Sequence, residues 1–329
     1  MDSCRLGISF GYESTLYSFP RPHPFNSSRL DQFTVSLRRL EQASRRSGSV
    51  KIEKPVSATE DDLLLFHTQE YVNFVKSSSK GSGAEYLDYG DTPSYRGVYE
   101  AAMLTVGSTL RGLDEILQGG VDHYFNPVGG LHHARRDRAG GFCVFNDCAI
   151  AILKALEKFQ RVAYVDIDCH HGDGVYYGFE SDPRVIIGDI HEDGRYLYPG
   201  TGFAYESGSG PAKGTKLNIP LPPGSGDAEF IQAFDKVMDF VKRSNSEFIF
   251  FQCGADGLAD DPITHLRYSS KAHAYAANGL HKIAHDMCEG RILAMGGGGY
   301  NAANINDAWM AVIADLAKIE NKKEGKREQ

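Results

Sequence analysis

The sequence predicts an α/β fold in which helices cover both faces of a mostly parallel central sheet. Short apolar runs recur along the second half of the chain and alternate with longer segments of helical periodicity. This alternation is typical of strand–helix–strand units. Each apolar run also ends in polar residues, which places candidate chemistry at the carboxyl edge of the sheet. The strand candidates with this pattern are 162–168, 185–191, 247–256 and 291–295.

The first half of the chain is expected to contribute one strand, an extended segment and several helices. Residues 5–10 form the strand candidate, and Ser28 is a candidate N-cap for a helix over residues 29–43. Residues 48–55 are expected to form a plain connection. The further elements predicted here are a helix from about 58, a helix from 67 capped by Thr68, a loop over 77–82, a turn over 89–93, a helix over 95–118 and an extended segment over 121–128.

The second half supplies the helices that would cover the sheet. They are predicted over residues 145–159, 227–243, 271–288 and 304–319. Neither a Pro/Ser-rich linker nor an internal repeat divides the 329 residues. We therefore expect one domain over residues 1–319 and a charged, solvated tail over residues 320–329.

Composition narrows the classes of function. Lys+Arg 35 against Asp+Glu 43 gives a net charge of −8, which argues against direct nucleic-acid binding. No apolar stretch approaches the length needed to span a membrane, and residues 1–10 lack the features of a secretory signal. The six cysteines form no CxxC pair, which is typical of a reducing compartment. A cytoplasmic location is the expectation.

Residues 162–174 carry the strongest functional signal. Here a buried strand candidate runs into a loop rich in carboxylates and imidazoles. Side chains alternate along a strand, so Asp166, Asp168 and His170 are expected on one side and apolar residues on the other. Two carboxylates and an imidazole crowded together would repel or stay unsatisfied unless a cation neutralised them. A metal site is therefore predicted, and ordinary loop caps are the weaker explanation.

A second strand end completes the predicted metal site. Asp256 ends an apolar run as Asp168 does, so the two carboxylates can meet at one edge of the sheet. Asp168, His170 and Asp256 make three protein ligands and leave a position open, as in catalytic sites. The donor set suits Zn²⁺ and also Fe²⁺ or Co²⁺.

Two adjacent histidines and a tyrosine are the candidate acid–base and hydrogen-bonding groups. His132 and His133 follow a Gly-Gly pair, and each ring needs its own orienting partner. Asp166 and Asp173 are the available carboxylates, and a histidine held by a carboxylate is a tuned acid or base. Tyr300 follows four glycines that let the backbone bring its phenol over the metal. Taken singly, these residues also fit a polar turn or a packed aromatic.

Together these motifs resemble the histone deacetylase superfamily, in its compact microbial branch, where some members are labelled acetoin-utilisation proteins. The similarity runs in order through nearly the whole chain. It rests on residues 23–29, 91–93, 130–134, 139–147, 166–173, 198–202, 254–256 and 296–301. The resemblance implies the arginase/deacetylase fold with a central parallel sheet, which agrees with the strand pattern.

The resemblance also implies an activity: hydrolysis of acetylated lysine side chains with release of acetate. The implied catalytic residues are His132, His133, Tyr300, Asp166 and Asp173. The implied metal ligands are Asp168, His170 and Asp256, usually with Zn²⁺. In relatives the histidines move protons between water and the leaving amine, and the tyrosine donates a hydrogen bond to the substrate carbonyl.

Further residues acquire expected roles from the same resemblance. Phe142 and Tyr198 would wall a narrow substrate channel beside Gly141, with Asp91 and Ile263 at its entrance. Arg29 corresponds to an arginine beneath the metal, near an internal cavity. A K⁺ ion is expected close to the metal, on carbonyl oxygens of Asp166, Asp168 and His170 together with Asp189.

Two departures and three alternatives qualify this interpretation. Tyr198 stands where many relatives have Phe, and Gly90 stands where many have a larger residue. An acetylpolyamine deacetylase with the same mechanism is the first alternative, although the apolar Ile263 at the entrance favours acetyl-lysine. A non-catalytic acyl-lysine-binding protein and a dinuclear arginase-type hydrolase are weaker alternatives. The oligomeric state and the physiological substrate stay open.

Overall fold

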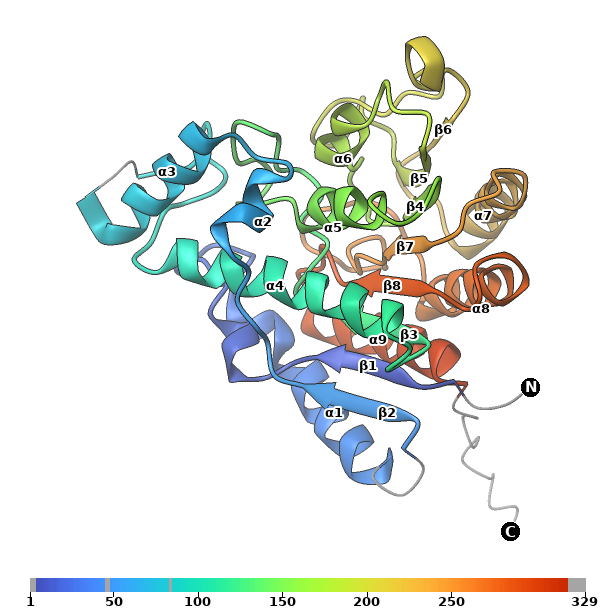
Figure 1. Cartoon of the computed structure of the whole chain (residues 1–329), viewed down its shortest axis with the longest axis horizontal. Coiled ribbons are helices and arrows are strands. Elements are labelled where there is room, and N and C mark those ends of the chain that lie inside the picture. The colour runs from blue at the N-terminus through green and yellow to red at the C-terminus, as the bar shows by residue number, and fades with distance from the viewer. Residues whose placement is uncertain (1–3, 45–47, 83–84, 319–329) are drawn as a thin grey trace.

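A computed structural model describes residues 4–44, 48–82 and 85–318 of the chain. Its centre is one sheet of eight strands in the order β2-β1-β3-β8-β7-β4-β5-β6 (Figure 1). All neighbouring strands pair in parallel. The strands are β1 (Leu6–Ser9), β2 (Val50–Glu53), β3 (His123–Asn126), β4 (Val162–Asp166), β5 (Val185–Glu192), β6 (Lys216–Leu221), β7 (Ile249–Gln252) and β8 (Ile292–Met295).

Helices cover both faces of this sheet, as the sequence pattern predicts. One layer consists of α2 (Glu60–Leu64), α3 (Gln69–Ser77), α4 (Val98–Leu117), α5 (Asp147–Ala155) and α6 (Asp173–Gly178). The opposite layer consists of α1 (Asp31–Ser44), α7 (Asp227–Lys242), α8 (Ser270–Met287) and α9 (Ala302–Leu316). Short 3-10 turns at Tyr12–Thr15, Ser27–Leu30 and Gly210–Ala212 and a π turn at Ser78–Ser82 lie in the connections.

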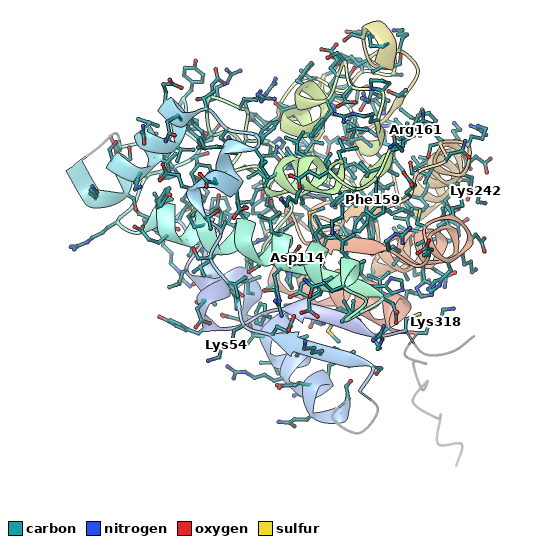
Figure 2. The ribbon with its side chains drawn as sticks, in the orientation of Figure 1. Lys54, Asp114, Phe159, Arg161, Lys242 and Lys318 are labelled. Atoms are coloured by element: carbon teal, nitrogen blue, oxygen red, sulfur yellow. The ribbon has the colours of Figure 1, made fainter. Side chains whose placement is uncertain are left out.

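Alternation along the strands divides the apolar core between the two faces. Tyr164 and Leu293 pack under the α4–α5 layer, whereas Val165 and Ala294 pack under the α7–α9 layer. Burying each large apolar side chain in this way stabilises the fold by about 1.5–3 kcal/mol. Charged side chains such as Lys54, Asp114 and Lys242 are exposed on the surface of the molecule (Figure 2). The helices among the described residues are all too short or too polar to cross a membrane.

Two details of the first half differ from the sequence-based expectations. Residues 48–55 contain an edge strand, β2, rather than a plain connection. Its side chains are only half buried, so the segment lacks the apolar signal of a central strand. Asn26 caps the 3-10 turn Ser27–Leu30 that leads into α1, because its side chain accepts a hydrogen bond from the Ser28 amide, so Ser28 is not the cap. Thr68 does cap α3, by accepting from the amide of Tyr71.

β6 and α6 are present although the sequence did not single them out. β6 is the other edge strand and contains Pro220, which a central strand would exclude. α6 is a six-residue helix that begins at Asp173, directly after the polar loop of β4. The predicted tail, residues 320–329, lies outside the described residues.

Candidate active site

The site lies at the carboxyl edge of the sheet, where β4, β7 and β8 end side by side. Beyond β4 the side chains continue to alternate between the two sides, as expected. Val165, Ile167 and Cys169 all pack into the same core cluster. The residues between them therefore face away from that core, toward the site. The amide of Asp168 donates to Asp166 Oδ1 at 3.0 Å, which folds the loop back over the strand end.

Asp168, His170 and Asp256 meet at this edge, and all three are buried. Each offers one ligand atom, and these atoms lie within 4.8 Å of one another. His170 Nδ1 lies 3.2 Å from Asp168 Oδ1 and 3.0 Å from Asp256 Oδ2. On a tetrahedral ion with bonds of about 2.0–2.2 Å, such ligand atoms would be roughly 3.4 Å apart. The cluster therefore fits one divalent ion.

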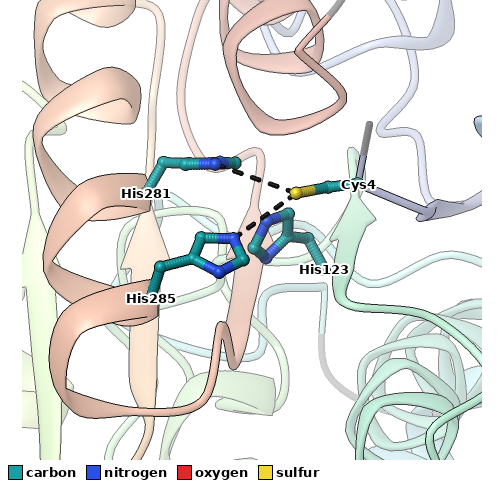
Figure 3. Close-up of side chains that lie close together, drawn as sticks. All are labelled: Cys4, His123, His281 and His285. Atoms are coloured by element: carbon teal, nitrogen blue, oxygen red, sulfur yellow. Dashed lines mark hydrogen bonds between the residues drawn. The ribbon is translucent and has the colours of Figure 1, made fainter. Parts of the chain in front are cut away.

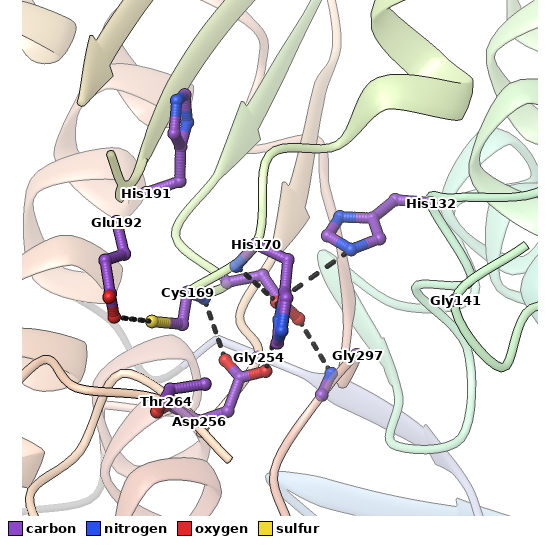
Figure 4. A network of polar contacts seen from close by, with 12 residues as sticks. His132, Gly141, Cys169, His170, His191, Glu192, Gly254, Asp256, Thr264 and Gly297 are labelled. Atoms are coloured by element: carbon purple, nitrogen blue, oxygen red, sulfur yellow. Dashed lines mark hydrogen bonds and ion pairs between the residues drawn. The ribbon is translucent and has the colours of Figure 1, made fainter. Parts of the chain in front are cut away.

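The other oxygen of each carboxylate is held by protein donors. Asp168 Oδ2 accepts from the Gln252 side-chain amide and from the Gly298 backbone amide, both at 2.8 Å. Asp256 Oδ1 accepts from the amide of Cys169 at 2.8 Å. Figure 4 shows the contact between Cys169 and Asp256, with His170 beside them and the ring of His132 on the other side of His170. Such outer contacts fix the ligands and leave one oxygen of each for an ion.

His132 and His133 each have the carboxylate partner that the sequence predicted. The Nδ1–H of His132 donates to Asp166 Oδ2 at 2.8 Å, and that of His133 donates to Asp173 Oδ1 at 2.7 Å. Their Nε2 atoms lie 3.1 Å apart, so the rings converge instead of pointing in opposite directions. They converge because the chain turns sharply at Gly130, which has a φ of 87°.

A buried carboxylate outside the predicted set holds this histidine loop. Asp147, the first residue of α5, accepts from the amides of Gly130 and Leu131 at 3.0 and 2.8 Å. The carboxylate at a helix N-terminus is itself favoured by the helix dipole. Asn146 holds the same loop by donating its side-chain amide to the carbonyl of Ala134 at 2.9 Å. The loop is therefore anchored to α5.

The two rings differ in proton affinity. Burial opposes a charge on His132, but Asp166 and Asp168 outweigh it and raise the pKa of His132 to about 10. Burial and the adjacent His132 lower the pKa of His133 to about 4, against the opposing effect of Asp173. A cation bound beside Asp168 would lower the pKa of His132 by offsetting that carboxylate. The 3.1 Å separation of the two Nε2 atoms allows a proton to pass between the rings.

Tyr300 and Arg29 lie beside the metal cluster. Burial raises the pKa of the Tyr300 phenol well above its usual range, so the hydroxyl stays protonated. The amide of Tyr300 donates to Asp261 Oδ2 at 2.9 Å, a carboxylate that the sequence did not single out. Arg29 is buried, and its guanidinium donates to the carbonyls of Gly297 and Gly299 at 3.2 and 3.1 Å. It also stacks over Phe25 at 3.8 Å.

A cavity of about 200 Å³ leads to the cluster. Its lining contains every expected channel residue together with Leu197, which was not expected: Asp91, Gly141, Phe142, Tyr198, Ile263, His133, His170, Tyr300 and Leu197. Phe142 and Tyr300 meet edge to face with ring centroids 5.8 Å apart. Gly141 has a φ of 51°, and a Cβ there would lie 2.4 Å from His133 Cδ2. Only glycine fits between the channel wall and this ring.

Asp189, which is expected near a monovalent cation, lies on β5, the strand next to β4. Asp189 is fully buried on β5, and its Oδ2 accepts from the amide of Gly172 at 3.0 Å. Its Oδ1 lies 2.5 Å from His191 Nδ1, so one carboxylate oxygen already has a charged-pair partner. The structure thus places Asp189 beside the loop of Asp166 and Asp168 and leaves the ion itself a prediction.

Known proteins resemble this chain over nearly its whole length. Residues 23–316 match the family described as histone deacetylase domain. The acetoin utilization protein AcuC of Bacillus subtilis (strain 168) is 39% identical over 311 residues, 92% of this chain and 78% of that protein. A probable deacetylase of Archaeoglobus fulgidus is 34% identical over 300 residues, 90% of this chain and 81% of that protein.

Solved structures share the fold as well. The crystal structure of the HDA15 HD domain has a TM-score of 0.85 at 28% identity and covers 96% of this chain and 88% of its own. A crystal structure of an HDAC homologue complexed with SAHA has a TM-score of 0.84 at 30% identity, over 96% of this chain and 84% of its own. The structural similarity therefore extends over nearly the whole chain.

Proposed function

The chain belongs to the histone deacetylase family, and from that premise we propose that it is a zinc-dependent deacetylase of acyl-lysine side chains. The observation that carries the proposal is the convergence of Asp168, His170 and Asp256 with the His132–His133 pair at the base of one cavity. Three buried ligands beside an accessible cavity are typical of a catalytic metal site.

Asp168, His170 and Asp256 would hold the divalent ion, and Zn²⁺ is the ion we propose. When bound, it would polarise the amide carbonyl and lower the pKa of a water molecule. Fe²⁺ or Co²⁺ would suit the same oxygen and nitrogen donors. The hydrogen bonds from Gln252 and Gly298 to Asp168 would keep that ligand in place during turnover.

We assign the proton transfers to the two histidines. His133 lines the cavity, and its low pKa leaves Nε2 free of an added proton at neutral pH. It would accept a proton as water attacks the carbonyl carbon, while Asp173 stabilises the resulting imidazolium. The C–N bond then breaks, and the protonated histidine delivers the proton to the leaving amine. His132, held by Asp166, shares a proton with His133 across 3.1 Å.

Tyr300 would stabilise the oxyanion that forms on the substrate. Its hydroxyl keeps its proton because burial raises the phenol pKa. A preorganised donor aimed at a developing charge stabilises the transition state more than the ground state. Arg29 would act indirectly, because it holds the carbonyls of Gly297 and Gly299 on either side of the turn before Tyr300.

The cavity supports a slender alkyl chain as the substrate group. Phe142 and Tyr198 would flank the methylene groups of lysine, with Asp91 and Ile263 at the entrance. The apolar Ile263 favours a neutral peptide surface over a polycation. An acetylpolyamine is the alternative substrate, favoured by the carboxylate of Asp91 at the same entrance. Deacetylation releases acetate or a short carboxylate and leaves a free ammonium.

Two further proposals rest on the family and on the cysteine pattern. K⁺ would bind carbonyl oxygens of Asp166, Asp168 and His170 together with Asp189, and would stiffen the loop that carries the ligands. A cytoplasmic location stays a prediction from the six cysteines, all of which are free and buried.

A substrate panel tests the proposed function. Zinc-loaded protein would be assayed for release of acetate from acetyl-lysine peptides, other short acyl-lysine peptides and acetylpolyamines. We expect the acetyl-lysine peptides to have the highest kcat/KM, and chelator-treated protein to lose turnover. A higher kcat/KM for acetylpolyamines would show that the protein is an acetylpolyamine deacetylase instead. Undiminished turnover after removal of all metal would overturn the metal-dependent mechanism.

A further inference from the structure

A second cluster of metal-binding side chains lies at the opposite edge of the sheet. Cys4 precedes β1, His123 is the first residue of β3, and His281 and His285 lie in the last two turns of α8. Leu6 pairs with His123, so the amino ends of both strands meet here. Four ligand atoms from these residues lie within 4.8 Å of one another (Figure 3).

The cluster contains buried imidazole nitrogens without partners. His123 is 0% exposed, and neither of its ring nitrogens makes a hydrogen bond within the described part of the chain. His281 is also buried, and its Nδ1 has no partner there. A buried polar nitrogen left unsatisfied costs about 1–3 kcal/mol. A metal ion that accepts one lone pair from each ring would offset part of that cost.

The rings are packed around the cysteine sulfur. Cys4 Sγ lies 3.8 Å from His281 Nε2 and 3.4 Å from His285 Nε2, and Figure 3 shows the His123 ring beside the same sulfur. Zn–S bonds of about 2.3 Å and Zn–N bonds of about 2.0–2.1 Å place sulfur and nitrogen roughly 3.5 Å apart on a tetrahedral ion. The observed separations are therefore compatible with sulfur and nitrogen atoms bound to one ion. They are equally compatible with weak S–H hydrogen bonds.

We propose that Cys4, His123, His281 and His285 form a second zinc site with a structural role. Four protein ligands complete a tetrahedral ion and leave no position for substrate, which distinguishes this site from the three-ligand catalytic cluster. One thiolate and three imidazoles are a softer donor set than two carboxylates and an imidazole, and they favour Zn²⁺ over Mg²⁺ or Ca²⁺. The i, i+4 spacing of His281 and His285 places both on one face of α8.

The ion would join segments that are far apart in the sequence. It would tie Cys4, two residues before β1, to the start of β3 and to the end of α8, on the face that α8 covers. The low pKa values of His123, about 4, and of His281, about 3, follow mainly from burial and keep both rings neutral and able to bind metal. Cys4 must lose its proton on binding, so affinity should fall as the pH falls.

Metal counting and cobalt spectroscopy test the site. Full-length protein, with any affinity tag removed, would be loaded with Zn²⁺, dialysed and measured for zinc per chain. We expect two ions in the wild type and one ion in Cys4→Ser. Replacement by Co²⁺ should produce a sulfur-to-cobalt charge-transfer band in the near ultraviolet. This band reports on the second site alone, because the catalytic ligands contain no sulfur.

Matched variants separate this site from other effects. Cys288 is buried close to the end of α8 but lies outside the cluster, so Cys288→Ser should keep two zinc ions and the cobalt band. His285 is exposed, so His285→Asn should fold and still lose the second ion. Deacetylation by zinc-loaded Cys4→Ser should stay within twofold of the wild type. A wild type that binds one ion, or a cobalt band that persists in Cys4→Ser, would overturn the proposal.

Discussion

The two edges of the sheet hold contrasting clusters of metal-binding side chains. At the carboxyl edge, two carboxylates and one imidazole lie at the base of a cavity of about 200 Å³. At the amino edge, one thiol and three imidazoles surround one point. The first cluster has fewer ligands than a tetrahedral ion needs, and the second has enough. Ligand number thus separates a site suited to chemistry from one suited to holding the fold together.

The surroundings of the ligands differ in the same sense. At the carboxyl edge each carboxylate is oriented by backbone or amide donors, and two further histidines stand ready to move protons. At the amino edge the ring nitrogens of His123 have no partner among the described residues. Outer hydrogen bonds orient metal ligands and raise their basicity, and the carboxyl-edge cluster has more of them. Four experiments test or refine this contrast.

Removing a carboxylate ligand should have the largest effect. Asp256→Asn should lose the catalytic ion and reduce kcat/KM by roughly 10³-fold or more, because the ion supplies several kcal/mol of transition-state stabilisation. Zinc analysis after dialysis should find the amino-edge ion still bound. If Asp256→Asn retained its full zinc content, the ligand assignment at the carboxyl edge would be wrong.

Removing one hydroxyl should have the next largest effect. Tyr300→Phe should reduce kcat by about 10²–10³-fold, as expected for loss of one oxyanion donor. Zinc content and substrate binding should stay unchanged, because Tyr300 is not among the metal ligands. Kinetics together with equilibrium binding of a substrate peptide to the variant would separate these quantities. Turnover equal to that of the wild type would remove Tyr300 from the mechanism.

A buried histidine outside both clusters provides a reference for pH dependence. His67 accepts a hydrogen bond from the Asn146 amide at 2.9 Å, and burial lowers its pKa to about 3. Below pH 6.5 this imidazole is protonated in the unfolded chain but stays neutral in the folded protein. The free energy of unfolding therefore decreases as the pH is lowered. The slope from this residue should be about 1.4 kcal/mol per pH unit.

His67→Gln should remove that slope. Urea unfolding of metal-free wild type and metal-free variant between pH 6.5 and pH 5 would measure the difference. The free energy of unfolding of the variant should depend less on pH. If the free energies of unfolding of wild type and variant had the same pH dependence, His67 would be protonated in the folded protein as readily as in the unfolded chain. Burial also lowers the pKa of His123 and of His281, so His67 serves as a reference for those two rings.

A charge at the channel entrance should have the smallest effect. Ile263→Glu would add a carboxylate beside Asp91, and attraction of about 1 kcal/mol for a polycation corresponds to roughly fivefold in kcat/KM. We expect acetylpolyamines to gain by that factor relative to acetyl-lysine peptides. The gain should shrink at high salt. An unchanged ratio would show that the entrance does not select the substrate.

The sequence predicted the central strands and the short motifs, but it did not predict the two edge strands. β4, β5, β7 and β8 are fully buried and each begins with an apolar run, so their composition identifies them. β2 and β6 lie at the two edges with mixed side chains, and their pairing depends on a neighbour that the local sequence does not reveal.

The same distinction applies to the sites. His132, His133 and residues 166–173 lie in short motifs, so the sequence could single them out. The amino-edge cluster combines residue 4, residue 123 and two residues of α8, and only the i, i+4 pair His281 and His285 offered a local signal. Asp147 and Asp261 were missed because each acts through backbone amides of a distant loop. Only the tertiary structure brings such groups together.

The contact of Arg29 with the last glycine turn has a consequence for engineering. Its two hydrogen bonds join the segment before α1 to the turn that carries Tyr300. An Arg29→Ala variant would keep every strand of the sheet, yet the phenol of Tyr300 would lose the two hydrogen bonds that hold its turn. Substitutions of Arg29 should therefore be judged by catalytic rate, because expression yield and helical content would not reveal the damage.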